Sequence, residues 1–158
     1  MPVYNQFYLL TNPATGATSF DPRGLSVDGP KIPVEIQIPN ALAQSLGQQG
    51  MPVPTPVTGY ALIDTGASVT AVDATIIQNL GVNPVGIAQV QTPFGTVQQN
   101  QYPVRLVFPG TPLPSIGTSQ AIGSVLQSQG IIALIGRDVL THFILICNGP
   151  GGFISLAY

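Results

Sequence analysis

The order of apolar and polar residues along the chain predicts short β-strands that are separated by turns. Residues 32–38 alternate apolar and polar positions, which is typical of a half-buried strand. Residues 60–63 and 131–135 are unbroken apolar runs of strand length, as expected for strands that are covered on both faces. Because Gly and Pro interrupt these runs at short intervals, we expect an all-β fold.

Two hairpins are predicted from pairs of strand-like segments. Residues 85–90 and 96–108 flank the segment 91–95, which predicts a hairpin with Gly95 near its tip. The second hairpin ends the chain, with strands at 143–147 and 153–158 around the Gly-rich turn 148–152.

The segments that favour helices are short. The strongest is at residues 75–80, where Gly81 provides a stop, and residues 41–46 and 137–143 are further candidates. We expect one or two short helices in all. Residues 1–30 alternate short apolar runs with turn formers, which predicts an N-terminal arm or an extra hairpin ahead of one domain at 31–158.

The composition narrows the function classes. Hydrophobic residues make up 44% of the 158-residue chain and charged residues only 6%, with four Lys and Arg in total and a net charge of −2. So few cations form no basic patch for phosphates, and we expect no nucleic-acid partner. Charged residues interrupt the longest apolar stretch, 130–147, which argues against a membrane span.

Location and cofactors are also constrained. The start Met1-Pro2-Val3-Tyr4 lacks a basic stretch followed by an apolar core, so we expect no signal peptide and a cytoplasmic protein. Cys147, the only cysteine, is expected in the core, and His142, the only histidine, is expected to be partly buried. One His and one Cys make no metal site, and we expect no metal or cofactor.

One segment carries candidate chemistry. In Ile63-Asp64-Thr65-Gly66-Ala67-Ser68, an aspartate stands where a buried strand meets a Gly turn, which places its carboxyl beside backbone donors. Peptide hydrolysis by carboxyl groups needs two of them in contact, because two like charges a few Å apart do not both ionise and one keeps its proton. Neither Asp73 nor Asp138 repeats this turn, so the second carboxyl is expected from a two-fold homodimer.

Two motifs together resemble a known family. Residues 62–68, Leu-Ile-Asp-Thr-Gly-Ala-Ser, are followed after a hairpin by residues 133–140, Ala-Leu-Ile-Gly-Arg-Asp-Val-Leu. This pair resembles the signature of the retropepsins, which are retroviral and retrotransposon aspartic proteases and their cellular relatives. The similarity spans residues 32–158, and it implies a closed β-barrel subunit of a two-fold homodimer, without a cofactor.

The resemblance also implies roles for individual residues. Asp64 is the expected catalytic residue, Thr65 is expected to hydrogen-bond across the dimer axis, and the Gly66 carbonyl is expected to bind the substrate backbone. The expected supports of the Asp64 turn are Ala67, Ser68, Leu134, Ile135 and Gly136. The expected flap, which closes over a bound polypeptide, consists of Thr92, Pro93, Phe94 and Gly95.

The chain departs from the retroviral pattern at two places. Ser68 stands opposite Arg137 where many retroviral enzymes have an acidic residue, which favours the cellular branch of the family. The flap is stiffer and more aromatic than the Gly-rich retroviral one. Arg137 and Asp138 are candidates for a structural ion pair near the interface.

The sequence therefore predicts an aspartic endopeptidase that cleaves an extended polypeptide through a dyad of Asp64 and its copy in the second subunit. Two alternatives belong to other classes. One is a catalytically silent retropepsin-like module that binds peptides or dimerises. The other is a structural or assembly protein, which the uncharged, Gln- and Pro-rich composition would suit.

Overall fold

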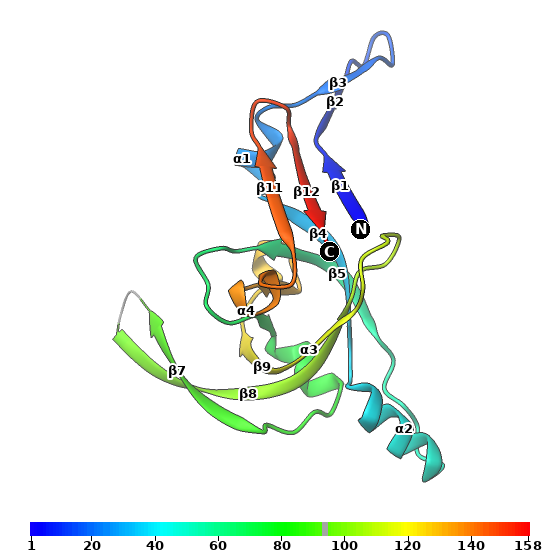
Figure 1. Cartoon of the computed structure of the whole chain (residues 1–158), viewed down its shortest axis with the longest axis vertical. Helices are drawn as coiled ribbons and strands as arrows, with labels where there is room; N and C mark the ends of the chain where they lie inside the picture. The colour runs from blue at the N-terminus through cyan, green and yellow to red at the C-terminus, as the bar shows by residue number, and fades with distance from the viewer. Residues whose placement is uncertain (93–94) are drawn as a thin grey trace.

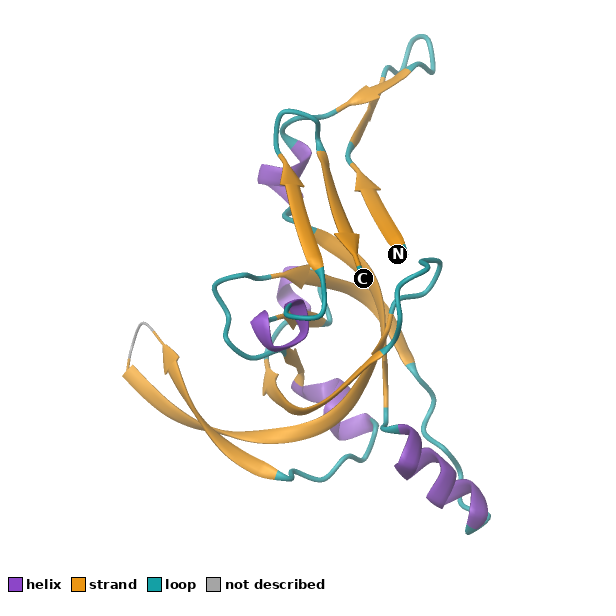
Figure 2. Ribbon diagram, in the orientation of Figure 1, coloured by secondary structure: helices purple, strands orange, loops and turns teal. Residues whose placement is uncertain are grey.

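The computed structural model describes residues 1–92 and 95–158, and within them the chain is mostly β (Figures 1 and 2). The strands form sheets of three, seven and two strands. The expected all-β class is confirmed.

The strands are β1 (Val3–Phe7), β2 (Leu9–Thr11), β3 (Thr18–Phe20), β4 (Lys31–Gln37), β5 (Val57–Ile63), β6 (Ala71–Asp73), β7 (Gly86–Thr92), β8 (Gly95–Val107), β9 (Ile116–Ser124), β10 (Ala133–Ile135), β11 (Ile144–Asn148) and β12 (Phe153–Ala157). The helices are α1 (Gly24–Asp28), α2 (Asn40–Gln48), α3 (Ala74–Asn79), α4 (Arg137–Leu140) and a 3₁₀ turn, η1 (Gln127–Gln129).

The large sheet surrounds the main core. Its strand order is β4-β5-β10-β6-β9-β8-β7, and β4 pairs with β8 as well as with β5. The alternation in β4 explains its place, because Ile32, Val34 and Ile36 are fully buried while the residues between them are only partly covered. Each such side chain contributes about 1.5–3 kcal/mol of hydrophobic stabilisation.

The short strand β10 is central to the site. It pairs in parallel with β5, with Leu134 opposite Leu62 and Ile135 opposite Ile63, and in antiparallel fashion with β6. Parallel neighbours require a long crossover connection, which here comprises residues 64–132. The two motifs thus lie side by side, although about seventy residues separate them along the chain.

Strands β7 and β8 form the long hairpin that extends from the rest of the sheet in Figure 1. The 13 residues of β8 change character along the strand: the first four are exposed, whereas Val104 and Leu106 near its end are buried. One half of β8 therefore belongs to the projecting hairpin and the other half to the core.

The two ends of the chain lie in one small sheet. Its order is β1-β12-β11, and Val3 pairs with Ala157 (Figure 1). The predicted C-terminal hairpin is present as β11 and β12. The expected core position of Cys147 is wrong, because β11 is an edge strand and Cys147 is exposed, and His142 is exposed as well.

The sequence underestimated two kinds of element. The described residues contain four α-helices instead of one or two, and α1 was missed because its five residues lie between turn formers and give no helical periodicity. Strand β9 was also missed, and its first residues were assigned to a turn-rich connection. Its Gly, Ser and Gln residues have low strand propensity, and it forms because β8 and β6 pair with it.

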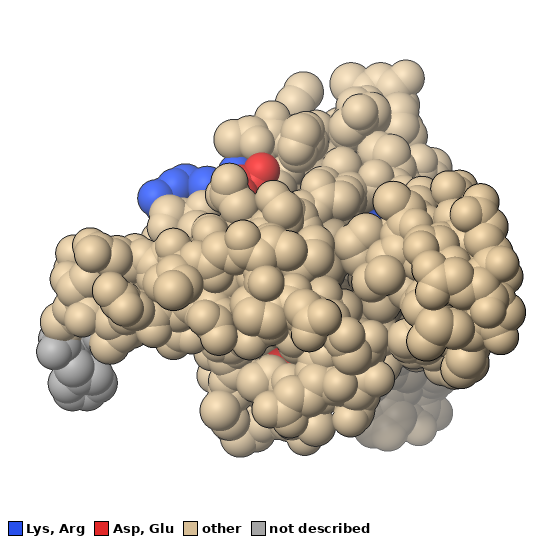
Figure 3. All heavy atoms as spheres, turned by 90° about the horizontal axis from the view of Figure 1, so that it is seen from below, with Lys and Arg blue, Asp and Glu red and all other residues tan. Residues whose placement is uncertain are grey.

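The surface carries little charge. Figure 3 shows one face on which nearly all described atoms belong to uncharged residues. Within residues 1–92 and 95–158, no helix is long and apolar enough to cross a membrane.

Candidate functional site

Asp64 directly follows β5 and begins a tight turn. Its Oδ1 accepts hydrogen bonds from the backbone N–H groups of Gly66 at 2.9 Å and Ala67 at 3.2 Å. A Cβ at position 66 would lie 3.1 Å from the same oxygen, so Gly66 allows the turn to close tightly around the carboxylate. Among the described residues, no hydrogen bond reaches Oδ2, which leaves this oxygen for a water or a substrate.

The second motif holds this turn in place. The backbone N–H of Asp64 donates to the carbonyl of Ile135 at 3.0 Å. The N–H groups of Arg137 and Asp138 donate to the carbonyls of Ala67 and Ser68 at 3.0 and 3.3 Å. The carboxyl end of β5 is therefore tied to the start of α4 on both sides of the Asp64 turn.

The Arg137 side chain binds the turn as well. Its Nη1 donates to the carbonyl of Thr65 at 2.8 Å and to that of Gly66 at 3.1 Å. The expected ion pair is not formed within the described part of the chain, where the one ion pair joins Arg23 and Asp21. Sequence reasoning missed this role, because nothing in the residue pattern shows that a guanidinium reaches two backbone carbonyls.

A buried threonine connects the two motifs. Thr70 is fully buried, and its hydroxyl donates to Oδ1 of Asp138 at 2.8 Å and accepts from the N–H of Gly136 at 3.0 Å. A Cβ at position 136 would lie 2.6 Å from the carbonyl carbon of Val69, so only Gly permits this close approach. Thr70 was also missed from the sequence, since its role depends on the pairing of β6 with β10.

A cleft of about 500 Å³ opens beside the turn. It is lined by residues of the two motifs, Gly66, Ala67, Ser68, Leu134 and Arg137, and by the adjacent Val69. Its lining also includes Gln89, Val90 and Gln91 of β7, and Ala71, Ile122 and Ser124. The cleft thus lies between the Asp64 turn and the long hairpin, and it has the size of many ligand sites.

Two of the four expected flap residues, Thr92 and Gly95, lie at the end of this hairpin. The backbones of Thr92 and Gly95 pair as the last residues of β7 and β8. Pro93 and Phe94 lie outside the described residues. The hairpin residues that line the cleft are Gln89 to Gln91, which lie further from the hairpin tip than the residues 92–95 that the sequence indicated.

The other aspartates near the motifs serve different contacts. Asp73 is buried and accepts four hydrogen bonds, from the N–H groups of Thr75 and Leu126 and from the N–H and side-chain amide of Gln127, the first residue of η1. Asp138 binds Thr70, and its Oδ2 is buried without a hydrogen-bond partner in the described part of the chain. The protomer thus offers a single carboxylate, Asp64, at the turn beside the cleft.

Metal chemistry has no obvious ligands. No group of three or more His, Cys, Asp or Glu side chains that would suit a metal ion occurs in residues 1–92 and 95–158.

The comparisons with known proteins give structural likenesses only. No protein-family model matches the chain, and no curated protein matches it. It is similar to a retropepsin-like aspartic protease from Rickettsia conorii, with 15% identity over 98% of this chain and 90% of that one and a TM-score of 0.48. It is also similar to the simian foamy virus protease, with 16% identity over 69% of this chain and 91% of that one and a TM-score of 0.41.

A third likeness is to the foamy virus protease–reverse transcriptase, with 14% identity over 72% of this chain and a TM-score of 0.45. The chain spans 12% of that protein's length. These proteins are proteases of the kind that the two motifs resemble. At such values of identity and TM-score, the function has to be argued from the site itself.

Proposed function

We propose that this chain is one subunit of a homodimeric, retropepsin-like aspartic endopeptidase. The observation that carries the proposal is the Asp64 carboxylate, whose Oδ1 is fixed by two backbone N–H groups while the turn itself lines a cleft. The pairing of β4 with both β5 and β8 supports a small closed barrel formed by residues 31–158, to which residues 1–30 add an arm. The second carboxyl comes from Asp64 of the other subunit, with the cleft at the interface.

The mechanism follows from two adjacent carboxyls. Because they share one proton, the ionised Asp64 removes a proton from a water, whose oxygen attacks the scissile carbonyl carbon. The protonated Asp64 donates its proton to the carbonyl oxygen, and a tetrahedral diol forms. Breakdown of the diol breaks the C–N bond: one carboxyl gives its proton to the leaving nitrogen, and the other carboxylate takes a proton from a diol hydroxyl, which becomes the carbonyl oxygen of the product acid. The dyad then returns to its starting state.

Substrate binding uses the hairpin. An extended polypeptide lies between β7 and the floor formed by the two motifs, and its alternate side chains enter pockets on either side. Arg137 keeps the Thr65 and Gly66 carbonyls in position, so that Gly66 presents a fixed acceptor to the substrate backbone. Closure of the flap, Thr92 to Gly95, excludes water from the cleft.

The test compares wild type with Asp64→Asn on a diverse peptide pool from pH 3 to 8, with the oligomeric state recorded in the same buffers. Glu35→Gln, which neutralises a carboxylate on β4 outside the cleft lining, serves as the matched control. We expect cleavage by wild type and by the control, inhibition by a compound that mimics the tetrahedral intermediate, and at least a thousandfold loss in Asp64→Asn. Cleavage that survives in Asp64→Asn would refute the proposal.

The alternative is a retropepsin-like module that binds peptides without cleaving them. The observation in its favour is that Asp64 itself is absent from the residues that line the cleft. Peptide binding that is unchanged by Asp64→Asn, with no cleavage by a confirmed dimer, would select this alternative.

A further inference from the structure

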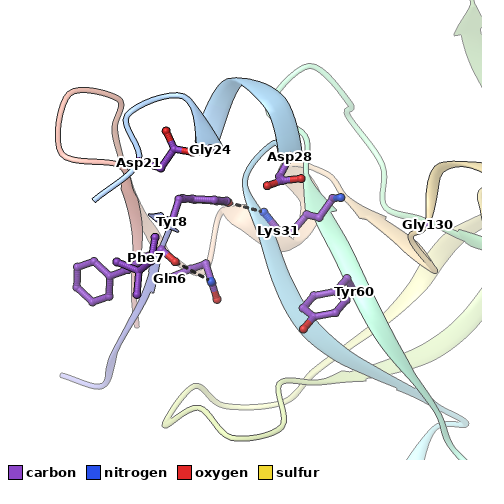
Figure 4. A pocket seen from close by; sticks show the side chains of 10 residues that line it. Gln6, Phe7, Tyr8, Asp21, Gly24, Asp28, Lys31, Tyr60 and Gly130 are labelled. Carbon is purple, nitrogen blue, oxygen red and sulfur yellow. Dashed lines mark hydrogen bonds between the residues drawn. The ribbon is translucent and has the colours of Figure 1, made fainter. Parts of the chain in front are cut away.

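A second pocket, of about 320 Å³, lies between the N-terminal arm and the main sheet (Figure 4). Phe7, Leu9 and Asp28 come from the arm, Lys31 and Tyr60 from β4 and β5, and Gly130 from the loop before β10. In Figure 4 the Lys31 side chain lies between those of Asp28 and Tyr60. The pocket thus combines aromatic and aliphatic walls with one cation, Lys31, and two carboxylates, Asp21 and Asp28, of which Asp21 pairs with Arg23 at 3.6 Å.

The strand register places this pocket next to the cleft. Lys31 pairs with Leu62 across β4 and β5, and Leu62 pairs with Leu134 across β5 and β10. Leu134 lines the cleft, and Leu62 and Leu134 pack against the same apolar cluster. Side chains of directly paired residues lie on one face of a sheet. One row of side chains therefore leads from the cleft through Leu62 to Lys31.

Lys31 differs from the other three cations of the chain. Arg23 pairs with Asp21, Arg105 donates to Gln37, Asn40 and Ser115, and Arg137 donates to two carbonyls. Within the described residues, the Lys31 ammonium has neither a hydrogen-bond acceptor nor a carboxylate within 4 Å, although its side chain is partly buried. A partly buried charge is stabilised by a partner of opposite sign.

We propose that this pocket is an outer subsite of the cleft, which binds an acidic side chain of an extended polypeptide substrate through the Lys31 ammonium. The proposal rests on the endopeptidase function proposed above. The apolar stem of a glutamate packs against the Tyr60 ring, while its carboxylate meets Lys31. The two carboxylates of the lining do not reverse this preference, because Asp28 is exposed to water and lies beyond 4 Å from the Lys31 ammonium, and Asp21 is paired with Arg23.

The proposal assigns a function to part of the N-terminal arm. Phe7 and Leu9 belong to residues 1–30, yet they form walls of a pocket whose floor includes β4 and β5. Tyr8 fixes the arm to the start of β4, since its hydroxyl donates to the Gly29 carbonyl at 2.5 Å and accepts from the Lys31 N–H at 3.3 Å. The arm thus shapes substrate preference without contributing to the chemical step.

The test uses matched decapeptide pools that carry either Glu or the isosteric Gln at one scanned position, with the other positions randomised. For wild type we expect kcat/KM to favour Glu about fivefold at a single outer position. Lys31→Met should reduce that ratio to about one, and Lys31→Arg should retain it. Arg105→Gln, which removes a cation that lies outside the pocket lining and bonds Gln37, Asn40 and Ser115, should leave the ratio unchanged.

Equal cleavage of the Glu and Gln pools by wild type at every position, or a Glu preference that persists in Lys31→Met, would overturn the proposal. If wild type cleaves neither pool, the endopeptidase function fails instead, and the same pools are titrated against the protein by NMR. Shifts of the Lys31 and Tyr60 amides that are larger with the Glu pool, and equal for both pools in Lys31→Met, would retain the acidic-peptide site. Equal shifts in wild type would overturn it.

Discussion

The hydroxyl of Thr70 donates a hydrogen bond of 2.8 Å to Oδ1 of Asp138, which lies 68 residues further along the chain. The same hydroxyl accepts a hydrogen bond from the N–H of Gly136 at 3.0 Å. Since Gly136 directly follows Ile135, whose carbonyl binds the Asp64 N–H, this threonine is two steps from the proposed catalytic residue. The stability of the site therefore depends on a side chain that does not line the cleft.

Replacement of Thr70 by Val should lower the free energy of unfolding by about 1–3 kcal/mol, because the buried Gly136 N–H and Asp138 Oδ1 lose their partner. Urea denaturation measures this loss. Thr70→Ser keeps the hydroxyl and should cost only about 0.8 kcal/mol for the lost methyl group. Equal losses in both variants would contradict a structural role of the hydroxyl.

Addition of a methyl group at Gly136 should be disruptive, because it would meet backbone atoms. In Gly136→Ala the new Cβ would lie 2.6 Å from the backbone of Val69, which has to move and takes the Asp64 turn with it. We expect a loss of at least 2 kcal/mol of stability, about the middle of the range for overpacked sites, and a loss of cleavage.

The matched control is Gly117→Ala, at a β9 position where a Cβ meets no atom within 4 Å. This change should be neutral or stabilise the chain by up to about 1 kcal/mol, since it restricts the unfolded state. Thermal unfolding compares the stability of the two variants, and a Gly136→Ala protein as stable as Gly117→Ala would disprove the predicted clash.

Much of the fold could be predicted because local patterns agree with it. The alternation of β4 and the apolar runs of β5 and β10 each reflect the faces that these strands bury. Strand β9 and α1 escaped prediction because tertiary pairing and short length, instead of propensity, determine them. The pairing of β1 with β12 joins the two ends of the chain and leaves no local signal.

In the candidate site, too, local features could be predicted from the sequence, whereas tertiary contacts could not. Asp64 and the two motifs were recognisable, since a tight Gly turn after a buried strand is a local feature. Thr70 and the carbonyl contacts of Arg137 depend on which strands become neighbours, and a single sequence does not show this. The exposure of Cys147 was mispredicted for the same reason, because an edge strand and a central strand have similar composition.

The position of the Arg137 guanidinium, whose Nη1 donates to two carbonyls, should matter more than its charge. Arg137→Lys keeps the positive charge but loses the guanidinium that bridges the Thr65 and Gly66 carbonyls, so the turn becomes less well fixed. We expect kcat/KM to fall about tenfold with little change in the urea midpoint. Arg105→Lys, which alters an arginine bound to Ser115 away from the cleft, should leave kcat/KM unchanged. A similar fall in both variants would indicate a general effect of replacing arginine.

Asp73 joins the N-terminus of α3 to the start of η1. Its carboxylate accepts hydrogen bonds from the N–H groups of Leu126, Thr75 and Gln127 at 2.9, 3.0 and 3.2 Å. Burial raises the pKa of Asp73, but these hydrogen bonds together outweigh burial, and the net pKa lies below the ordinary value of an aspartate. The folded state therefore binds this proton less readily than the unfolded state does.

The sign of the pH dependence follows from linkage. A lowered pKa in the folded state contributes stability above the unfolded pKa of about 3.9, and this contribution is lost as the pH falls through the folded value. Asp73→Asn places an amide among N–H donors, so at pH 7 it should be about 1–3 kcal/mol less stable than wild type. Because protonated Asp73 also loses its charge, the two stability curves should converge as the pH falls from 5 toward 2.

Urea denaturation across this range measures the difference in the free energy of unfolding between the two proteins. The contributions of the other carboxylates are the same in both proteins and cancel in this difference. Two curves that stay parallel would show that Asp73 does not contribute to acid sensitivity, and the hydrogen bonds to residues 126 and 127 would then stabilise the loop independently of charge.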